Sequence, residues 1–306
     1  MKILISGATG FIGMKLIQEL KKDGHELFGL TRNIESAQKK DTDVIWIKWE
    51  SHNEIIDLKP YGKIDAVINL VGENLANKRW NNEQKKIIYN SRVEATRTLC
   101  KSIRESQEKV DVFVSTSAIG IYGDRETEEI HEDSLIVDDF IGSLCKDWEE
   151  ALTSNSDVYS RHVIIRVGLV LGKNGGMMEK LLPLFSLGLG GKLSSGKQYM
   201  SWIHLDDICR IFLKALTDND MQGVHNGTAP FPVTNKEFTE VLGKTIRKPT
   251  AFTVPKLALK IAMGEMAEHV LSGARIIPKK LKENDFHFIY PTIEKAIKDV
   301  VSKDRK

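Results

Sequence analysis

Three glycines near the start of the chain have the spacing of a phosphate-binding loop. Gly7, Gly10 and Gly13 lie between a short apolar run and the amphipathic segment Phe11–Lys22. Gly7 permits a tight turn, Gly10 lets the backbone approach an anion, and Gly13 allows a helix to pack closely on a strand. The free N–H groups and the positive dipole end of that helix would then face the anion. The loop predicts a site for the diphosphate of a dinucleotide, with an ordinary glycine-rich turn as the alternative. The predicted contacts are Gly7, Thr9, Gly10, Phe11, Ile12 and Gly13.

The residues after the second apolar run indicate which dinucleotide would bind. A site for NAD usually carries an acidic residue there, which holds the ribose 2′-hydroxyl. This chain has Leu30-Thr31-Arg32-Asn33 instead. No carboxylate repels a 2′-phosphate, and the guanidinium of Arg32 can bind one through two parallel hydrogen bonds. Thr31 and Arg32 therefore favour NADP(H) over NAD(H), with a solvated surface charge as the alternative for Arg32.

Short apolar runs alternate with longer amphipathic segments through the first half of the chain. The runs are rich in Val and Ile and are bounded by Gly, Asp or Ser. They are Lys2–Ser6, Glu26–Thr31, Val44–Lys48, Ala66–Val71, Val112–Thr116 and His162–Val167. The predicted helices between them include Phe11–Lys22 and Asn82–Ser106. This alternation requires crossover connections, so it predicts an α/β fold with a Rossmann-like, doubly wound parallel sheet.

The sequence changes character after about Gly172, where glycine-rich and proline-punctuated stretches begin. We predict a dinucleotide-binding domain over residues 1–225, in which residues 173–201 reach toward the substrate side. Residues 226–306 are predicted to form a smaller C-terminal domain on the substrate side. The sequence shows no internal repeat or heptad array, which excludes solenoid and coiled-coil folds.

Composition narrows the classes of partner. The 306 residues include 44 basic and 42 acidic side chains, a formal net charge of +2, so neither nucleic acid nor an anionic membrane is expected as a partner. We expect a small-molecule substrate and a monomer or homodimer. Cys100, Cys145 and Cys209 are far apart and odd in number, so no disulfide framework and no metal site is predicted. The first apolar run is too short for a signal peptide or a membrane span, and we expect a cytoplasmic protein.

Further motifs follow the predicted strands and continue into the C-terminal region. In the first two thirds these are Asn69-Leu70-Val71-Gly72, Asn90, Ser115-Thr116-Ser117-Ala118, Tyr122-Gly123, Arg166–Gly172 and Trp202–Asp207; in the last third they are Pro232–Phe238, Gly264–Glu268 and Pro278–Leu281. Over almost its whole length the chain resembles the extended, atypical short-chain dehydrogenases/reductases of the NAD(P)-dependent epimerase/dehydratase superfamily. Its C-terminal motifs are similar to the small domain that marks the epimerase family proteins. The resemblance implies Leu70, Gly72 and Asn90 as further cofactor-binding residues.

Two of these motifs also have plainer interpretations. Asp206 and Asp207 either have a substrate role or cap a helix that contains Ile208 and Phe212. The segment Gly264–Glu268 is interpreted as part of a helix whose residues pack rather than react.

The family's usual catalytic pair is missing. Dehydrogenases of this superfamily use a Tyr with a Lys four residues later, which share a helix face so that the ammonium favours the phenolate. Aligning Cys145–Glu149 on that helix puts Ile141 in the Tyr position and Cys145 in the Lys position. None of the six tyrosines of the chain has a lysine four residues on. A reaction that uses this relay is therefore disfavoured, whereas cofactor binding is unaffected.

Ser117 and Tyr122 are the candidates for the remaining chemistry. Both follow the fifth predicted strand at its carboxyl end, where doubly wound sheets bind ligands. Ser117 matches the neighbourhood of the serine that holds the substrate oxygen in the family. Tyr122 is the candidate for a substitute acid or hydrogen-bond donor. The alternative is that Ser117 satisfies backbone groups and that Tyr122 only packs under the cofactor.

Two functions are consistent with this sequence. The first is an NADP(H)-dependent oxidoreductase or epimerase that acts on a small polar molecule, with Ser117 and Tyr122 orienting a carbonyl group. The second is a non-catalytic dinucleotide-binding sensor or regulatory protein, which the missing pair motivates.

Overall fold

The first strand and the first helix form as the sequence predicts. β1 (Lys2–Ser6) is a buried strand, and α1 (Phe11–Lys22) buries Leu16, Ile17 and Leu20 on one stripe. The computed structural model describes residues 1–51, 54–173 and 175–302. In that part of the chain, no helix is long and apolar enough to cross a membrane.

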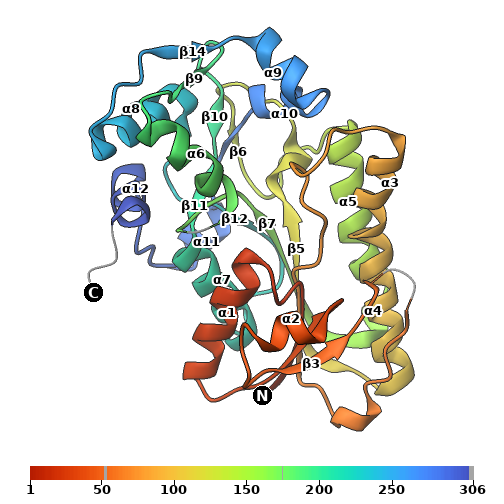
Figure 1. Ribbon diagram of the computed structural model, residues 1–306. Coiled ribbons are helices and arrows are strands. Elements are labelled where there is room, and N and C mark those ends of the chain that lie inside the picture. The colour runs from red at the N-terminus through yellow and green to blue at the C-terminus, as the bar shows by residue number, and fades with distance from the viewer. Residues whose placement is uncertain (52–53, 174, 303–306) are drawn as a thin grey trace. The chain divides into compact units, whose positions relative to one another are not determined.

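The central sheet has seven strands (Figure 1). Their order across the sheet is β12 (Gly223–Gly227), β7 (Tyr159–Val167), β5 (Val110–Ala118), β4 (Ala66–Asn69), β1, β2 (Glu26–Thr31) and β3 (Ile45–Lys48). The pairs from β5 to β3 are parallel, and Leu4 of β1 lies between Phe28 and Val67 of its two neighbours. The predicted strands are all present with small changes at their ends. β12 was not predicted, because its sequence Gly-Val-His-Asn-Gly lacks the apolar run of a central strand.

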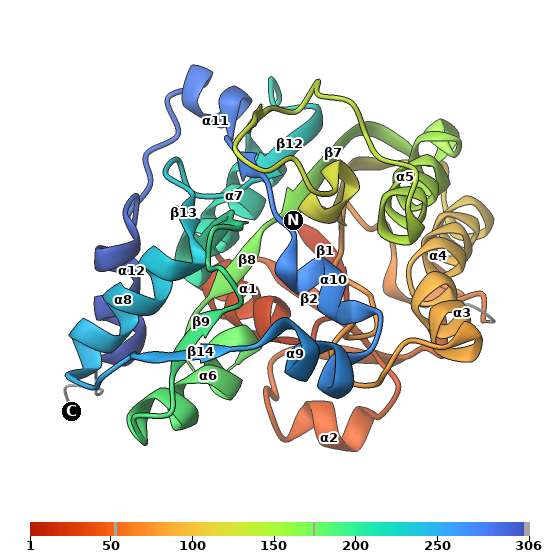
Figure 2. The same ribbon diagram turned by 90° about the horizontal axis from the view of Figure 1, so that it is seen from above.

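Helices cover both faces of this sheet, as a doubly wound fold requires (Figures 1 and 2). α3 (Asn82–Asn90), α4 (Val93–Ser106) and α5 (Phe140–Thr153) lie on one face, whereas α1 and α7 (Leu205–Thr217) lie on the other. The short helix α2 (Ile34–Gln38) follows β2. Short 3₁₀ helices cover Lys59–Tyr61, Ile119–Tyr122 and Ser156–Val158. The predicted Rossmann-like α/β fold is therefore confirmed.

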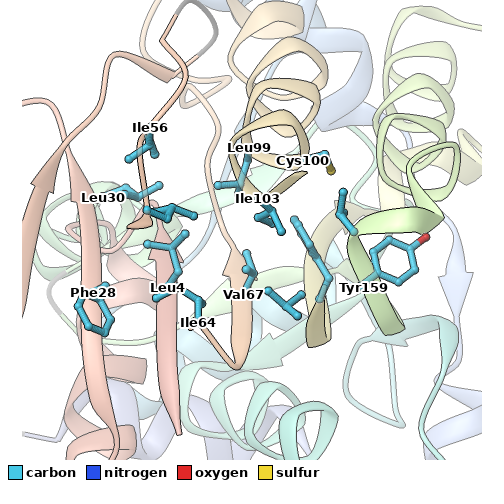
Figure 3. Packing of buried hydrophobic residues seen from close by; sticks show 14 of the residues in the cluster. Leu4, Phe28, Leu30, Ile56, Ile64, Val67, Leu99, Cys100, Ile103 and Tyr159 are labelled. Atoms are coloured by element: carbon cyan, nitrogen blue, oxygen red, sulfur yellow. The ribbon is translucent and has the colours of Figure 1, made fainter. Parts of the chain in front are cut away.

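The core beneath α4 is formed by side chains from many parts of the first 165 residues. Figure 3 shows Leu4, Val67 and Ile103 converging from β1, β4 and α4, and each of them is fully buried. Burying such side chains contributes roughly 1.5–3 kcal/mol each relative to leaving them in water. This core holds the carboxyl ends of the central strands in place.

The predicted helix Asn82–Ser106 is wrong in one respect, because the structure divides it into α3 and α4. The break falls at Ser91 and Arg92, which form a turn between the end of α3 and the start of α4. The Ser91 hydroxyl donates to the carbonyl oxygen of Ile88 at 2.9 Å. A serine side chain bonded to its own helix backbone competes with the helical pattern and favours an end at that point.

The chain forms two compact units that interleave along the sequence. The first consists of Met1–Ala118, Ser143–Arg166 and Cys209–Val224, and the second of Ile119–Gly142, Val167–Ile208 and His225–Lys306. The linear domain boundary at residues 225 and 226 stays a prediction, since the second unit also draws on segments before it.

The second unit combines short strand pairs with helices. Its strands pair as β10 (Tyr199–Met200) with β13 (Val233–Thr234), β11 (Trp202–His204) with β8 (Leu169–Leu171), β14 (Phe252–Val254) with β9 (Gly191–Leu193), and β15 (Arg275–Ile276) with β6 (Glu129–Ile130). Its helices are α6 (Gly176–Ser186), α8 (Asn235–Ile246), α9 (Lys256–Met263), α10 (Met266–Leu271), α11 (Lys279–Glu283) and α12 (Ile293–Val301). A buried cluster includes Trp202, Phe238 and Ile297.

Asp206, Asp207 and the segment Gly264–Glu268, for which the sequence also allows purely structural roles, lie at helix ends. Asp206 and Asp207 lie in the first turn of α7, and the carboxylate of Asp207 accepts hydrogen bonds from the backbone N–H groups of Ile289 and Tyr290 at 2.8 and 2.9 Å. Asp207 therefore ties the start of a helix to a distant loop. The segment Gly264–Glu268 spans the turn between α9 and α10 and the first residues of α10.

Candidate dinucleotide-binding site

The glycines of the first loop form a cradle that side chains would fill. A Cβ atom on Gly7 would lie 2.7 Å from the carbonyl oxygen of Leu70, and one on Gly13 would lie 2.5 Å from the carbonyl oxygen of Gly7. Gly7 also has φ +65°, a conformation that L-residues rarely adopt. The N–H of Gly10 donates to the carbonyl oxygen of Gly7 at 3.0 Å and closes the turn. Gly7 and Gly13 therefore have the steric roles that the sequence predicts, and the approach of an anion to Gly10 stays a prediction.

The start of α1 leaves its backbone donors available to an anion. Gly10 is the N-cap residue and has no side chain to cap them, and no acidic residue lies in the first turn. The first helical residues, Phe11 and Ile12, are half-buried, and Gly10 is exposed. Uncapped N–H groups and a positive dipole end at an exposed loop are the features that bind phosphate oxygens.

The end of β2 presents Arg32 to solvent next to a fixed turn. Thr31 is buried, and its hydroxyl accepts a hydrogen bond from the N–H of Asn33 at 3.2 Å. Asn33 caps α2 through a bond from the N–H of Ser36 at 2.8 Å. Arg32 itself is exposed. The backbone of Arg32 thus lies between two hydrogen-bonded residues, Thr31 and Asn33, while its guanidinium faces solvent and can contact a ligand.

Sequence reasoning missed one cation at the glycine loop. The ammonium of Lys40, which follows α2, donates to the carbonyl oxygen of Thr9 at 3.1 Å. The two residues are 31 positions apart. No spacing rule places Lys40 at the loop, because the contact depends on where the chain runs after α2.

A buried network ties together the carboxyl ends of three neighbouring strands. Asn69 at the end of β4 accepts from the Ser6 hydroxyl at 2.6 Å and donates to the hydroxyls of Thr96 and Ser115 at 2.9 and 3.1 Å. The indole N–H of Trp148 donates to Thr96 at 3.1 Å. Fully bonded buried polar groups of this kind fix side-chain positions. The edge of the sheet where a ligand would lie is therefore rigid.

The family resemblance implies three further cofactor-binding residues. Leu70 and Gly72 follow β4, and Asn90 lies at the end of α3. Leu70 donates its N–H to the carbonyl oxygen of Ser6 at 3.2 Å, and its own carbonyl borders Gly7. Gly72 is exposed and lies against the guanidinium of Arg92. Asn90 is the last residue of α3 and is half-buried. The structure thus joins Leu70 to the glycine cradle.

Ser117 and Tyr122 are both buried, in different hydrogen-bonding situations. Ser117 is the penultimate residue of β5 and is 2% exposed, and its hydroxyl has no hydrogen-bond partner in the part of the chain that the structure describes. Tyr122 belongs to the second unit and is fully buried, and its hydroxyl donates to the Oδ1 atom of Asn226 at 2.8 Å. A buried hydroxyl without a partner is uncommon, so Ser117 is the stronger candidate to meet a ligand oxygen.

The positions of the family's usual pair hold buried, unreactive side chains. Ile141 is 5% exposed and Cys145 is 2% exposed. Burial raises the pKa of the Cys145 thiol to about 12. A thiol with this pKa stays protonated at neutral pH and is neither a base nor a nucleophile.

Comparison with known proteins identifies the family. Residues 3–226 match the NAD dependent epimerase/dehydratase family. The chain belongs to this family. Residues 254–300 match a domain of unknown function, DUF1731, in the region whose motifs resemble a small terminal domain.

Family members from plants, bacteria and animals are similar over nearly their whole length. The chloroplastic SDR39U1 homolog of Arabidopsis thaliana, an epimerase family protein, is 38% identical over 308 residues, covering 98% of this chain and 87% of the relative. The epimerase family protein Mb2239 of Mycobacterium bovis is 34% identical and covers 96% of each chain. The crystal structure of human SDR39U1 (isoform 2) with NADPH matches with a TM-score of 0.87 and 32% identity, covering 98% of this chain and 99% of that one. The predicted resemblance to the epimerase family proteins is confirmed.

Proposed function

We propose that this protein binds NADP(H) and transfers a hydride between the nicotinamide and a small polar carbonyl or alcohol substrate. The observation that carries the proposal is the cradle at Gly7, Gly10 and Gly13, whose space a Cβ atom would fill. The human relative was crystallised with NADPH, which supports the same cofactor here.

The residues of this chain fit that cofactor at several points. The backbone from Gly7 to Gly13 would hold the diphosphate, with Thr9, Phe11 and Ile12 in the same turn. Thr31 and Arg32 would hold the 2′-phosphate, and Leu70, Gly72 and Asn90 would border the rest of the molecule. The bound cofactor supplies a hydride donor or acceptor at its nicotinamide carbon C4.

The role of Arg32 can be tested by comparing the affinities for NADPH and for NADH, which lacks the 2′-phosphate. Arg32→Ala should weaken NADPH binding at least tenfold, a loss of about 1.4 kcal/mol, and should change NADH binding less than twofold. Isothermal titration calorimetry measures both affinities. Lys39→Ala is the matched control, because Lys39 is an exposed cation just after α2. An equal loss of both cofactors in Arg32→Ala contradicts the assignment.

Ser117 is proposed to hold the reacting oxygen of the substrate. Its buried hydroxyl can donate one hydrogen bond to a carbonyl oxygen and accept another. Tyr122 is the second candidate, although its hydroxyl is already bonded to Asn226. Removing a donor to a developing oxyanion typically costs 10²–10³ in turnover, so Ser117→Ala should lose roughly that factor.

Turnover is measured as loss of NADPH absorbance against a panel of small aldehydes, ketones and oxo acids. Tyr122→Phe tests the second candidate in the same assay. Unchanged thermal unfolding temperatures for both variants serve as the control, because these residues are buried. Turnover that survives Ser117→Ala undiminished contradicts the role of Ser117.

A non-catalytic sensor is the second candidate function. The observation that favours it is the buried Ile141 and Cys145, neither of which can transfer a proton at neutral pH. In that case cofactor occupancy changes the stability or the conformation of the protein without hydride transfer. Tight NADPH binding, with no turnover of any carbonyl compound in the panel, favours this function over the first.

A further inference from the structure

Lys40, which lies two residues after α2, reaches the glycine loop with its side chain. Its Nζ atom donates to the carbonyl oxygen of Thr9 at 3.1 Å, and Thr9 lies between Gly7 and Gly10. An ammonium has three N–H donors. Lys40 is exposed, and its ammonium has no other acceptor among the residues that the structure describes. Two donors at the edge of the loop can therefore meet a ligand.

The backbone that carries this side chain is held in place. The N–H groups of Lys40 and Asp41 donate to the carbonyl oxygen of the buried Ala37 at 2.9 and 3.2 Å. The carboxylate of Asp41 pairs with the ammonium of Lys21 in α1 at 3.0 Å. Lys40 thus extends from a fixed point of the chain. A group that is positioned in advance loses less conformational entropy when a ligand binds.

The ammonium of Lys40 lies at the end of α1 where a positive charge is least favourable. The N-terminal end of a helix carries a partial positive charge, and Thr9 leads directly into it. No acidic residue lies in the first turn of α1, and in the described part of the chain neither Lys40 nor Arg32 forms an ion pair. At the other end of α1, by contrast, Lys22 pairs with Glu19. An anion supplied by a ligand would balance the charge at the loop.

The register of the sheet indicates which anion this is. β1 and β2 are parallel, with Ile5 opposite Gly29, so the glycine loop and Arg32 leave the sheet side by side. The short helix α2 lies between Arg32 and Lys40 in the sequence. In a dinucleotide site, the end of the second strand faces the 2′ position of the ribose, whereas the start of the first helix holds the diphosphate. An anion that meets both Arg32 and Lys40 is therefore a phosphate at the 2′ position.

We propose that Lys40 is a specificity-determining residue that binds the 2′-phosphate of NADP(H) together with Arg32. The inference rests on the proposed function and adds a second cation to its cofactor site. Arg32 offers a planar pair of donors, and Lys40 offers a compact charge with donors that can rotate toward the phosphate oxygens. NADH lacks this phosphate and gains nothing from the ammonium.

The experiment compares two pairs of nucleotides that differ only in the 2′-phosphate. Calorimetry on the full chain measures the affinities for adenosine 2′,5′-bisphosphate and adenosine 5′-monophosphate, and for NADPH and NADH. Lys40→Ala should weaken binding of the bisphosphate and of NADPH about three- to tenfold, and should change the other two affinities less than about twofold. Lys39→Ala is the matched control, because Lys39 is exposed and has no ion pair among the described residues. It should bind all four nucleotides as wild type does.

Two further variants separate the charge of Lys40 from its support of the loop. Lys40→Arg keeps a cation and should retain the preference for both 2′-phosphorylated ligands. Lys40→Glu should weaken binding of these two ligands more than Lys40→Ala does, because a carboxylate repels the phosphate.

Three results would overturn the inference. Equal losses within each pair of nucleotides in Lys40→Ala would show that the residue only supports the loop or contacts the diphosphate. Unchanged affinities for all four nucleotides would show that Lys40 contacts none of them, although wild type still binds NADPH and the proposed function stands. Wild type that binds neither NADPH nor NADH would overturn the proposed function and this inference with it.

Discussion

Cys145 shows how a residue's environment decides its chemistry. At the level of sequence it stands where the family carries a lysine, and only the fold shows that it is buried beside Ala118. The roles of Gly7 and Gly13 could be predicted, because a turn and a close approach are local requirements. The bond from Tyr122 to Asn226 could not, since it joins residues 104 positions apart. Residue roles that depend on local backbone geometry can thus be predicted from the sequence. Roles that depend on partners far away in the sequence cannot.

The burial of Cys145 predicts that its thiol reacts slowly with alkylating reagents. Burial raises the pKa values of the Cys145 and Cys100 thiols to about 12, so both should resist iodoacetamide in the folded protein at pH 7.5. Mass spectrometry after a timed reaction measures the extent of labelling. All three cysteines should react once the protein is unfolded in guanidinium chloride, which is the control. Labelling of Cys145 in the folded state at the rate of a free thiol contradicts the burial that the structure shows.

Elements were predicted best where apolar periodicity is strong. β1, β2 and α1 have the predicted bounds, because the two strands are continuous buried runs, the helix has one buried stripe, and a glycine or polar residue follows each of them. The division of Asn82–Ser106 was missed, since apolar spacing continues across Ser91 and Arg92 and only side-chain bonding ends the helix there. β12 was missed because its place is set by the neighbouring strand rather than by its own residues.

The capping box at the start of α8 allows a quantitative test of how much a helix end contributes to stability. The Thr234 hydroxyl accepts from the N–H of Glu237 at 3.2 Å, and the Glu237 carboxylate accepts from the N–H of Thr234 at 2.7 Å. Thr234→Ala should lower the free energy of unfolding by about 1 kcal/mol, because this capping box satisfies two helix-end donors. Denaturant unfolding measures the change. Thr234→Ser keeps the hydroxyl and should stay within about 0.5 kcal/mol of wild type; a loss as large as that of Thr234→Ala would show that the methyl group matters instead.

The whole molecule is organised by interleaved segments rather than by one boundary. The core of the second unit contains Trp202 from before residue 225 and Phe238 and Ile297 from after it. Composition changes along the sequence cannot reveal this, because they report on neighbouring residues and not on which segments pack together. The predicted division into residues 1–225 and 226–306 is therefore open to a direct test.

A truncated chain that ends at residue 225 should fold poorly. It keeps Trp202, Met178 and Leu171 but loses the buried side chains of α8 and α12 that cover them. Exposed apolar surface of this size favours aggregation. Soluble yield and binding of a hydrophobic dye measure the effect, with the full chain as the control. A soluble fragment that unfolds cooperatively and binds NADPH would show that residues 1–225 are an independent domain.

The closed turn at Gly7 has a kinetic consequence. Because the turn is already closed by the hydrogen bond from Gly10 to Gly7, and Ser6 before it is bonded to Leu70, the amides that would meet a diphosphate need no ordering when it arrives. Little chain entropy is lost on capture, so the rate of association should increase linearly with nucleotide concentration in stopped-flow mixing. A rate that levels off at high concentration would reveal a slow isomerisation before or after the encounter.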